Sequence, residues 1–592
     1  MPITWGTIGA RPRSRSLGFS IRLHSSVSHN GTSPPLHPPL GPHMIQRKKR
    51  IVLFLPHRAD PDEGVRVAAD LLPLELLQIA AWPVEDGYEV VLIDAMVHDD
   101  YMEQLMEVCD GAMLFATSCI LGFQVAHGAR IAKAIRERFP SLPIIWGGWF
   151  PSVAPELYFE EGIADAVALG QGEITFREIV QAIDAGESLE SVNGLLIERD
   201  GKPFYTPHRE VVGFDKFPDA PWHLINYEDY VERQQNPGPW KMRHKYPDPW
   251  EMPAGTPVRG FSYFSSFGCP EPCTFCCSPM VTGRRWKAIP GKQTAERLLE
   301  LHDRFKFNVM RFQDANFGVA EKRSNQFCDT LTEAGSPFWW SGCYEVETIA
   351  RYKAESLDKL KESNCHMVSF GAEAGSAEQQ AVIKKNIDTG HFESSIREMY
   401  DRGITTGCSW IIGYPGETEE SMFETLRRAS EMKYKFPRAA SDVFPFRPIP
   451  GTEDFDKAVR LGYKAPRTLE EWGGCLEYRE SFDDIHIPED VLRTWKRYGV
   501  ASTFYDGLVM EGAEWFRAVL KRVSGWRLKT GRYGFPIEHK AFHSYVKMTK
   551  QTKADKLGQK TEAVELPGID RTVGVTTSAP VYSRPSDSSE AS

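Results

Sequence analysis

Two successive runs of alternating apolar strands and amphipathic helices constrain how this 592-residue chain can fold. A strand, a helix and a second strand in that order build parallel pairs, because a parallel crossover needs a dozen or more residues to return the chain. The first run therefore predicts an α/β domain with a doubly wound parallel sheet. Its five expected strands are residues 51–55, 88–94, 111–117, 142–146 and 164–169.

The second run predicts a barrel-like sheet. Six apolar segments alternate with helical segments such as 294–305 and 321–334. Six β/α units without a return strand favour a partial (β/α)6 barrel, and the Trp- and Tyr-rich sequence after it favours a helical C-terminal region. The expected barrel strands are residues 261–267, 309–313, 338–344, 366–371, 405–412 and 440–446.

These patterns divide the chain into six parts. Residues 1–48 and 551–592 lack apolar periodicity, so we expect a disordered N-terminal extension and a disordered tail. Residues 1–43 fit either an organelle transit peptide or an upstream extension ahead of a start at Met44. The other parts are the first α/β domain, a linker, the barrel and a helical C-terminal domain, at residues 49–190, 191–254, 255–454 and 455–550.

Charge and cysteine content narrow the partners and the compartment. The chain carries 70 Lys and Arg against 80 Asp and Glu, a net charge of −10, which argues against a nucleic-acid partner. Its apolar stretches fall short of the roughly 20 residues that a membrane span needs. Eleven cysteines in so long a chain are too few for a disulfide scaffold and favour a reducing, cytoplasmic compartment.

Three cysteines stand directly after the first strand of the second run. Cys269, Cys273 and Cys276 have a C-x3-C-x2-C spacing on an expected loop. A four-iron cluster normally takes four thiolates, so three would leave one iron open to a small molecule, as catalytic metal sites do. The alternative is a zinc loop, but no fourth Cys or His stands at zinc spacing. The adjacent Cys277 is expected to be a packed or incidental thiol.

The spacing, the Cys273-x-Phe-Cys276 core and the position after a first strand resemble the radical S-adenosylmethionine (SAM) superfamily. The resemblance implies a [4Fe-4S] cluster held by the three cysteines, with SAM on the open iron. It also implies reductive cleavage of SAM to a 5′-deoxyadenosyl radical, with electrons from a donor such as flavodoxin or ferredoxin. The chemistry would belong to the cofactor, and the protein would position it and exclude water.

Three further segments resemble SAM contacts of that family. Gln313-Asp314-Ala315-Asn316 stands where the family has Gly-Gly-Glu, and the segment 371–376 resembles Gly-x-Glu-Ser-Gly-Ser, with Ala374 in place of Ser. The segment 411–418 resembles the fifth-strand stretch that borders adenine. Each could also be a turn or a helix cap. The SAM contacts that the resemblance implies are Gln313, Asp314, Glu373, Ser376, Ile411 and Gly413.

Small and polar residues follow the strands of the first sheet, where ligands of doubly wound sheets bind. They are Thr117, Ser118, Gly147, Gly148, Gly170, Gly172 and Glu173. A flavodoxin-like sheet ahead of such a barrel resembles the cobalamin (B12)-binding subgroup, which implies cobalamin at these residues. The Asp-x-His-x-x-Gly motif that supplies a histidine to cobalt is absent, because Asp94 and His98 have the wrong spacing. A remnant domain that binds nothing is the alternative.

The resemblance implies an enzyme that methylates an unactivated carbon or phosphorus of a small-molecule substrate. One alternative is an oxidative cyclase or ring-rearranging enzyme of tetrapyrrole or natural-product biosynthesis. Another is a non-catalytic iron-sulfur protein, which would need a fourth cluster ligand. A nucleic-acid-modifying methylthiotransferase would need a second set of three cysteines. Tyr344 and Glu345, at the end of the third barrel strand, are the candidate catalytic residues, and they are expected, with Glu373, to face the barrel interior. Trp339 and Trp340 could stack on a planar substrate or pack in the core.

Overall fold

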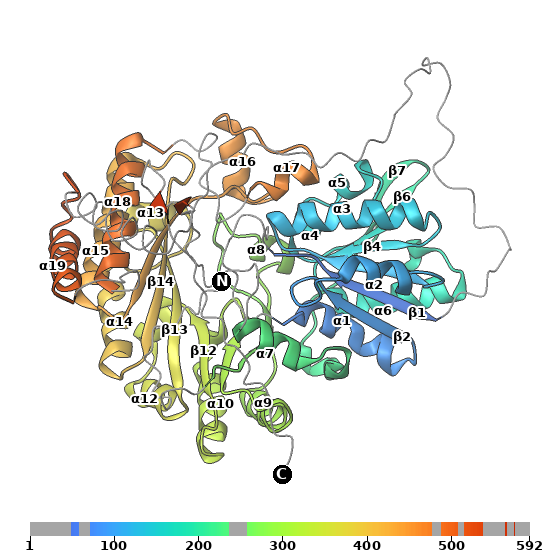
Figure 1. Ribbon diagram of the computed structural model, residues 1–592, viewed down its shortest axis with the longest axis horizontal. Coiled ribbons are helices and arrows are strands. Elements are labelled where there is room, and N and C mark those ends of the chain that lie inside the picture. The colour runs from blue at the N-terminus through green and yellow to red at the C-terminus, as the bar shows by residue number, and fades with distance from the viewer. Residues whose placement is uncertain are drawn as a thin grey trace, which may run out of the picture.

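The computed structural model describes residues 49–58, 72–235, 257–475, 487–506 and 514–536, together with a short antiparallel ribbon of β16 (Ala563–Val564) and β17 (Val573–Gly574). The predicted extension 1–48 and the rest of the predicted tail lie outside the described residues. Two α/β bodies lie side by side, and helices from the C-terminal part of the chain cover the second body (Figure 1).

The first body is built on a seven-stranded sheet in the order β2-β1-β3-β4-β5-β6-β7. β1 to β5 run parallel, and β6 and β7 add an antiparallel edge. The order 2-1-3-4-5 is that of a flavodoxin-like doubly wound sheet, so the predicted fold is confirmed. The strands are β1 (Arg50–Leu55), β2 (Glu89–Asp94), β3 (Leu114–Ser118), β4 (Ile144–Gly147), β5 (Ala166–Ala168), β6 (Leu195–Arg199) and β7 (Lys202–Tyr205).

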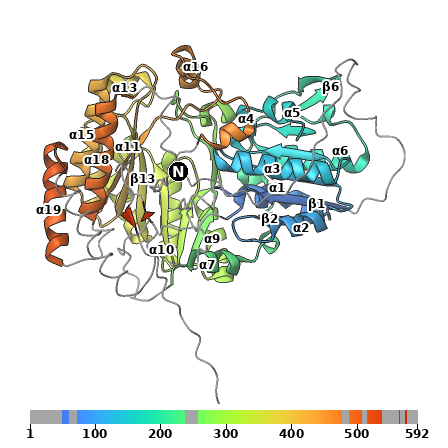
Figure 2. The same ribbon diagram turned by 45° about the horizontal axis from the view of Figure 1, so that its top comes forward.

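Helices cover both faces of this sheet, because its strands are buried on both sides. α1 and α6 pack on one face, where Leu53 and Ile145 point. α2 and α3 pack on the other, against Phe54 and Trp146, with the short helices α4 and α5 beside them (Figure 2). The helices are α1 (Leu74–Glu85), α2 (Tyr101–Val108), α3 (Phe123–Arg138), α4 (Trp149–Val153), α5 (Glu156–Glu160) and α6 (Gly172–Ala185).

The segment predicted as a linker is folded where the structure describes it. β6 and β7 lie within it and extend the first sheet past the predicted boundary at residue 190. α7 (Tyr227–Gln235) joins the two bodies: the Tyr230 hydroxyl donates to Asp94 Oδ2 (2.9 Å), and the Gln234 amide exchanges two hydrogen bonds with the Gly260 backbone (2.8 and 3.0 Å). The sequence did not predict β7, because this edge strand is largely exposed and carries no apolar alternation.

The second body is built on a six-stranded parallel sheet in the order β15-β14-β13-β12-β11-β8, which confirms the partial (β/α)6 barrel. Its strands are β8 (Gly260–Tyr263), β11 (Val309–Phe312), β12 (Trp339–Tyr344), β13 (Cys365–Glu373), β14 (Thr405–Ile412) and β15 (Ala440–Pro445). The main helices outside the sheet are α9 (Gly291–Phe305), α10 (Glu321–Glu333), α12 (Ala354–Glu362), α14 (His391–Asp401) and α15 (Glu419–Lys435).

The first barrel strand is two strands rather than one. β8 ends at Tyr263, and β9 (Ser266–Gly268) leaves the sheet to pair with β10 (Trp286–Ala288) in an antiparallel ribbon. Gly268 has a φ of +84°, and a Cβ there would fall 2.0 Å from the Arg285 carbonyl oxygen, so only glycine allows this pairing. The ribbon closes a loop that contains the three cysteines and the short helix α8 (Ser278–Thr282).

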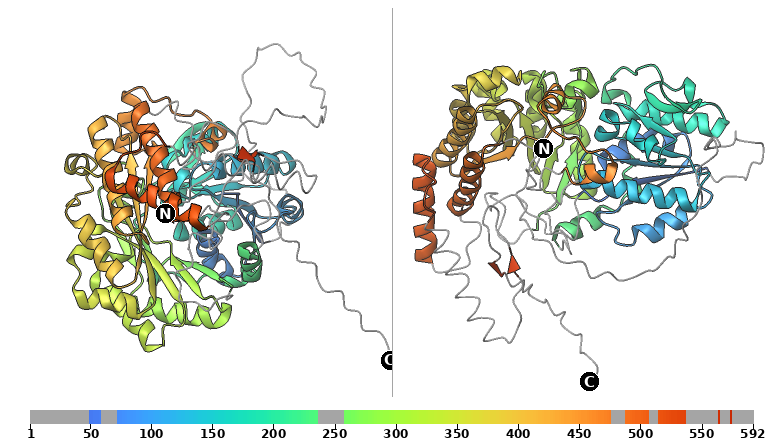
Figure 3. Two further views of the ribbon diagram at one scale, coloured as in Figure 1. Left: turned by 60° about the vertical axis from the view of Figure 1, so that its left-hand side comes forward. Right: turned by 90° about the horizontal axis from the view of Figure 1, so that it is seen from above.

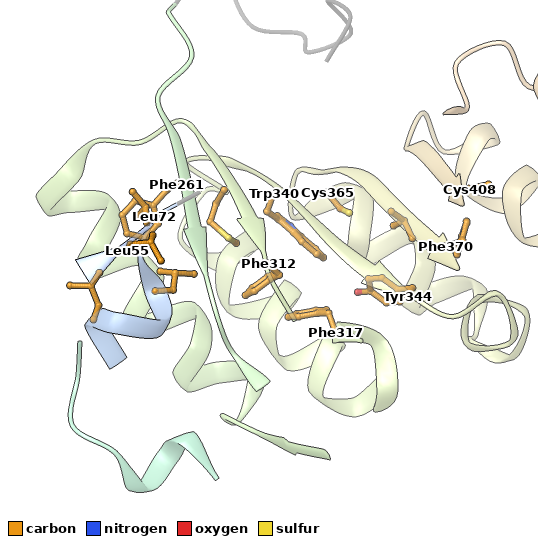
Figure 4. Close-up of a cluster of buried hydrophobic side chains, with 14 of the residues drawn as sticks. Leu55, Leu72, Phe261, Phe312, Phe317, Trp340, Tyr344, Cys365, Phe370 and Cys408 are labelled. Atoms are coloured by element: carbon orange, nitrogen blue, oxygen red, sulfur yellow. The ribbon is translucent and has the colours of Figure 1, made fainter. Parts of the chain in front are cut away.

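An aromatic layer fills the helix-facing side of the second sheet (Figure 4). Trp340 is fully buried against Phe312 and Phe317, which accounts for it as packing. The Tyr344 ring packs on Phe317 at 5.9 Å between centroids, and a Cβ at Gly318 would fall 2.1 Å from it. The prediction that Tyr344 faces the barrel interior is therefore wrong, because its ring lies between the sheet and the helices.

The helices after β15 contact both bodies (Figure 3). α18 and α19 pack against α15, whereas α17 packs on α3 of the first body, with Trp472 against Phe150 at 5.2 Å between ring centroids. Among the described residues, no helix combines the length and the apolar composition of a membrane span. The helices are α16 (Glu453–Arg460), α17 (Leu469–Gly473), α18 (Glu489–Asp506) and α19 (Glu514–Thr530).

Two adjacent tryptophans offer a test of this packing. Trp340→Ala should lower the free energy of unfolding by about 3–5 kcal/mol, because it empties a buried site and removes the indole hydrogen bond to the Ser363 carbonyl. Trp339→Ala is the matched control, since Trp339 is only partly buried and lies over Lys361. Urea unfolding followed by circular dichroism measures both variants. Equal midpoints for the two would contradict the assignment of Trp340 to the aromatic layer.

Candidate functional site

Cys269, Cys273 and Cys276 lie on the loop between β9 and α8. Cys273 is buried and the other two are partly buried. Burial raises the pKa of the Cys269 thiol to about 12 and raises the pKa of Cys273 above its usual range. A hydrogen bond with Cys277, followed by burial, raises the pKa of Cys276. The cysteines therefore lie where a metal, rather than water, would have to stabilise their thiolates.

Three hydrogen bonds and one aromatic contact hold the cysteine loop at its centre. The Thr274 amide donates to the Ile383 carbonyl (3.1 Å), and the Thr274 hydroxyl donates to Asp454 Oδ2 (2.7 Å). The Asp454 amide donates back to the Thr274 carbonyl (3.2 Å). Phe275 packs edge-on against Tyr414, with the ring centroids 5.5 Å apart. The loop is thus fixed by the segments after β13, β14 and β15.

The thiol arrangement suits a cluster better than a single ion. Among the described residues, no three His, Cys, Asp or Glu side chains converge as the ligands of one metal ion do. A four-iron cluster binds each thiolate at a different iron, so it does not require that convergence. The three cysteines would hold such a cluster.

Glu345 and Glu373 stand at the ends of the neighbouring strands β12 and β13. Glu373 has a φ of +62°, and a Cβ at Gly371 would fall 2.2 Å from Glu373 Oε1, so this glycine makes room for the carboxylate. Lys385 Nζ lies 2.7 Å from Glu345 Oε2 and 3.6 Å from Glu373 Oε1. Burial raises the pKa of Glu373, and the charge of Lys385 opposes that shift. The structure therefore brings two predicted residues together around a lysine that the sequence did not single out.

Asp314 and Gln313 follow β11 and support the strand that enters the cysteine loop. Asp314 Oδ1 accepts from the Ser265 amide (2.7 Å), and Oδ2 accepts from the hydroxyls of Ser265 and Ser266 (2.6 Å each). The Gln313 amide oxygen accepts from the Arg311 guanidinium (2.9 and 3.1 Å). Both carboxylate oxygens of Asp314 are used within the protein, so a SAM contact at Asp314 would have to share them.

The other predicted SAM contacts follow β13 and lie at the end of β14. Ser376 caps α13 (Ala377–Val382) by accepting from the Gln379 amide (3.2 Å). The Gly413 amide donates to Glu417 Oε2 (2.7 Å), and Ile411 joins the small apolar cluster that includes Phe275 of the cysteine loop. The contacts of all three residues with SAM stay predictions.

The carboxyl edge of the first sheet carries the seven residues predicted for cobalamin. Gly148 has a φ of +101°, and a Cβ there would fall 2.5 Å from the Cys119 carbonyl oxygen. Thr117 Oγ1 and Glu173 Oε2 are buried and have no hydrogen-bond partner among the described residues. Leaving such an atom unpaired costs about 1–3 kcal/mol. The glycine lets β3 and β4 end close together, and two buried polar atoms in need of partners fit a ligand rich in amides and hydroxyls, as cobalamin is.

This edge lies next to the cysteine loop. The Trp149 ring of α4 stacks on Phe267 of β9, with centroids 6.2 Å apart and planes 18° apart. A Cβ at Gly170 would contact the Val281 carbonyl oxygen of α8 at 3.5 Å. The predicted cobalamin residues of one body and the predicted cluster ligands of the other are therefore neighbours across the interface.

Several polar residues of the first body are part of its packing. Cys119 is buried and lies 3.2 Å from the Tyr158 hydroxyl. His127 Nδ1 accepts from the His57 amide (2.9 Å), and its Nε2 lies 3.0 Å from the Tyr101 hydroxyl. Burial lowers the pKa of His57 to about 4 and that of His127 to about 3. The two histidines are therefore neutral at physiological pH, and their rings pack at a tilt, with centroids 4.7 Å and planes 32° apart.

Thr274, Lys385 and Asp454 were missed by the sequence analysis. Thr274 stands between two motif cysteines, which was a usable signal for it. Lys385 follows the Gly-x-Glu segment by a dozen residues, and Asp454 stands at the start of a helix, where acidic residues are common. Lys385 and Asp454 are recognised as part of the site only by their contacts with residues distant in the sequence.

Glu173 gives a pH-dependent prediction. Burial raises its pKa from 4.5 to about 7, so between these values the folded state holds a proton that the unfolded chain has lost. Stability should therefore fall as the pH rises through this window, by up to about 3 kcal/mol. Glu173→Gln should remove that fall, and the exposed Glu187→Gln should not. Urea unfolding at about pH 5 and about pH 8 tests this. A wild-type slope retained in Glu173→Gln would refute the assignment.

Asp454 gives a second prediction. Asp454→Ala removes the buried carboxylate that accepts the hydrogen bond from Thr274, in the middle of the cysteine loop. The reconstituted protein should therefore lose iron to a chelator several-fold faster than the wild type. The exposed Asp456→Ala, on the same helix, is the control. Iron release is followed by absorbance of the chelate. Identical rates for both variants would show that the loop does not depend on Asp454.

Comparisons with known proteins agree with this geometry. Residues 64–180 match the B12-binding domain model, and residues 263–429 match the radical SAM superfamily model. The first match covers the sheet edge with Thr117 and Gly148, and the second covers the cysteine loop, Glu373 and Gly413.

Distant relatives have different activities. An uncharacterized methyltransferase of Pyrococcus horikoshii is 26% identical over 69% of this chain and 83% of its own. The cytidylyl-2-hydroxyethylphosphonate methyltransferase of Streptomyces wedmorensis is 23% identical, over 67% and 79%. The anaerobic magnesium-protoporphyrin IX monomethyl ester cyclase of Synechocystis is 22% identical, over 64% and 71%.

The fold is also found among solved structures. The cobalamin-dependent SAM radical enzyme OxsB, with aqua-cobalamin and SAM bound, superposes with a TM-score of 0.60 over 85% of this chain and 75% of its own, at 14% identity. At that identity the likeness speaks for the fold alone. With both models matched in this order along the chain, the protein carries a B12-binding domain followed by a radical SAM superfamily domain, which together imply a [4Fe-4S] cluster, SAM and cobalamin as its cofactors.

Proposed function

We propose that this enzyme methylates an unactivated carbon or phosphorus of a small-molecule substrate. The observation that carries the proposal is the contact between the two cofactor edges: Trp149 stacks on Phe267, and Gly170 lies against Val281. When bound, the cluster with SAM supplies a 5′-deoxyadenosyl radical, and cobalamin supplies a methyl group. A substrate held at this contact would meet both.

The chain's own residues bind and orient the reactants. Cys269, Cys273 and Cys276 would hold the cluster, and Glu373 and Ser376 lie where they could hold SAM. Thr117 and Glu173 would give their unpaired polar atoms to cobalamin. The close packing between the bodies excludes water from the reaction, which protects a radical from side reactions.

The inner face of the second sheet suits a small-molecule substrate. Trp340 and Tyr344 point toward the helices, so the alternate residues Ser341 and Cys343 point inward. Parallel pairing carries this face across the sheet, from Cys343 to Ser369 and from there to Gly407. The Ser341 hydroxyl is buried without a hydrogen-bond partner among the described residues. Small and polar side chains here differ from the branched apolar residues that fill a closed barrel.

The named activities of the relatives support methylation and one alternative reaction. Two of them are named as methyltransferases, one of which acts on a phosphonate. The cyclase relative supports the alternative of an oxidative cyclase or a ring-rearranging enzyme. A non-catalytic iron-sulfur protein would need a fourth cluster ligand, and the motif supplies three cysteines.

The products of SAM distinguish these functions. Anaerobically reconstituted protein with iron, sulfide and hydroxocobalamin would be given SAM, a one-electron reductant and a small-molecule extract. A methyltransferase should form both S-adenosylhomocysteine and 5′-deoxyadenosine. A cyclase should form 5′-deoxyadenosine without S-adenosylhomocysteine, and a non-catalytic protein should form neither.

Two controls make the assay specific. Replacing Cys269, Cys273 and Cys276 with Ala should abolish 5′-deoxyadenosine and remove the iron, whereas Cys277→Ala should retain both. Omitting hydroxocobalamin should abolish S-adenosylhomocysteine alone. S-adenosylhomocysteine that forms without cobalamin would contradict the proposed role of the first domain.

A further inference from the structure

We propose that Lys385 is a positioning residue that holds Glu345 and Glu373 together and sets the charge beside the cluster. This inference rests on the proposed function, because it concerns the same site. Lys385 Nζ lies 2.7 Å from Glu345 Oε2 and 3.6 Å from Glu373 Oε1. Lys385 and Glu373 are buried and Glu345 is partly buried, with 5%, 11% and 13% of their side-chain surfaces exposed.

The burial of this triad makes its charge balance important. Two carboxylates at the ends of adjacent strands repel each other in a low-dielectric site, and one ammonium between them offsets that repulsion. Glu345 and Glu373 together raise the pKa of Lys385 despite its burial, so the ammonium stays charged. Removing one partner of a buried ion pair is strongly destabilising, because the other charge is left without compensation. Lys385 is therefore required to keep both carboxylates where they lie.

The backbone brings this lysine to the cysteine loop. The Ile383 carbonyl accepts the hydrogen bond from Thr274, and Lys385 follows two residues later. The Lys385 amide donates to the Gln380 carbonyl (3.1 Å), and the Gln380 side chain donates to the carbonyls of Ala372 and Ala374 (2.7 and 2.6 Å). One short segment therefore fixes the loop, the Glu373 backbone and the lysine at the same time.

The lysine also acts on the cluster. The Ile383 carbonyl, two residues before the lysine, binds the Thr274 amide between Cys273 and Cys276, so the buried ammonium stands close to the predicted cluster ligands. A buried positive charge stabilises the more negative, reduced form of a cluster, so Lys385 should raise the midpoint potential of the cluster. The same ammonium keeps Glu373 oriented toward the expected SAM site.

The test uses the full-length protein with its reconstituted cluster and no substrate. Lys385→Met should shift the midpoint potential to more negative values and weaken SAM binding about tenfold or more. Lys385→Arg should restore most of both, because it keeps the charge. Lys384 is exposed and pairs with Glu453 at the surface, so Lys384→Met should have the midpoint potential and the SAM affinity of the wild type. Redox titration by electron paramagnetic resonance and equilibrium dialysis with SAM measure the two quantities.

A second variant covers the case in which Lys385→Met fails to fold or to hold iron. Glu345→Gln keeps Lys385 and removes one negative charge, so it should shift the midpoint potential to more positive values. A potential that does not move in that direction would overturn the proposal. An unchanged potential and an unchanged SAM affinity in a folded Lys385→Met would do so as well. Neither measurement involves product formation, so failure of the proposed methylation would be seen separately.

Discussion

The Thr274 hydroxyl donates to Asp454 from the middle of the cysteine loop, and much of the site is arranged about that bond. The loop runs between β9 and α8, so strand and helix hydrogen bonds fix its two ends but not its middle. It is instead held by Asp454 after the last barrel strand and by the carbonyl of Ile383 after β13. Because buried polar groups must be paired, this attachment is specific in a way that apolar packing is not. The bonds of Thr274 to Asp454 and Ile383 therefore fix the positions of the three cysteines.

Much of the architecture was readable from the sequence. Alternating apolar segments predicted both parallel sheets, because a strand buried on both faces carries a continuous apolar run. The break between β8 and β9 was not readable, since it depends on Asp314 accepting hydrogen bonds from Ser265 and Ser266. The side-chain direction of Tyr344 was also hidden. β12 is largely buried on both faces, so hydrophobicity alone does not tell which alternate residues face inward.

The candidate site was predictable to the extent that it is local in sequence. The cysteine spacing, the glycines at the sheet edge and Glu373 stand in short motifs, and the structure places them on neighbouring loops. Lys385 and Asp454 act through contacts with residues far from them in the sequence, and neither residue type is unusual where it stands. Charge pairing of this kind leaves no periodic pattern, so it is visible only after folding.

The attachment of α16 and α17 affects what counts as the catalytic unit. α16 contains Asp454 in its first turn, and Trp472 of α17 packs on Phe150, two residues after Gly148 at the predicted cobalamin edge. A fragment that stopped at the end of β15 would retain all six barrel strands but lose both of these attachments. The smallest fragment of this chain able to assemble its two predicted cofactor edges therefore includes α16 and α17. The catalytic unit extends beyond the last strand of the barrel.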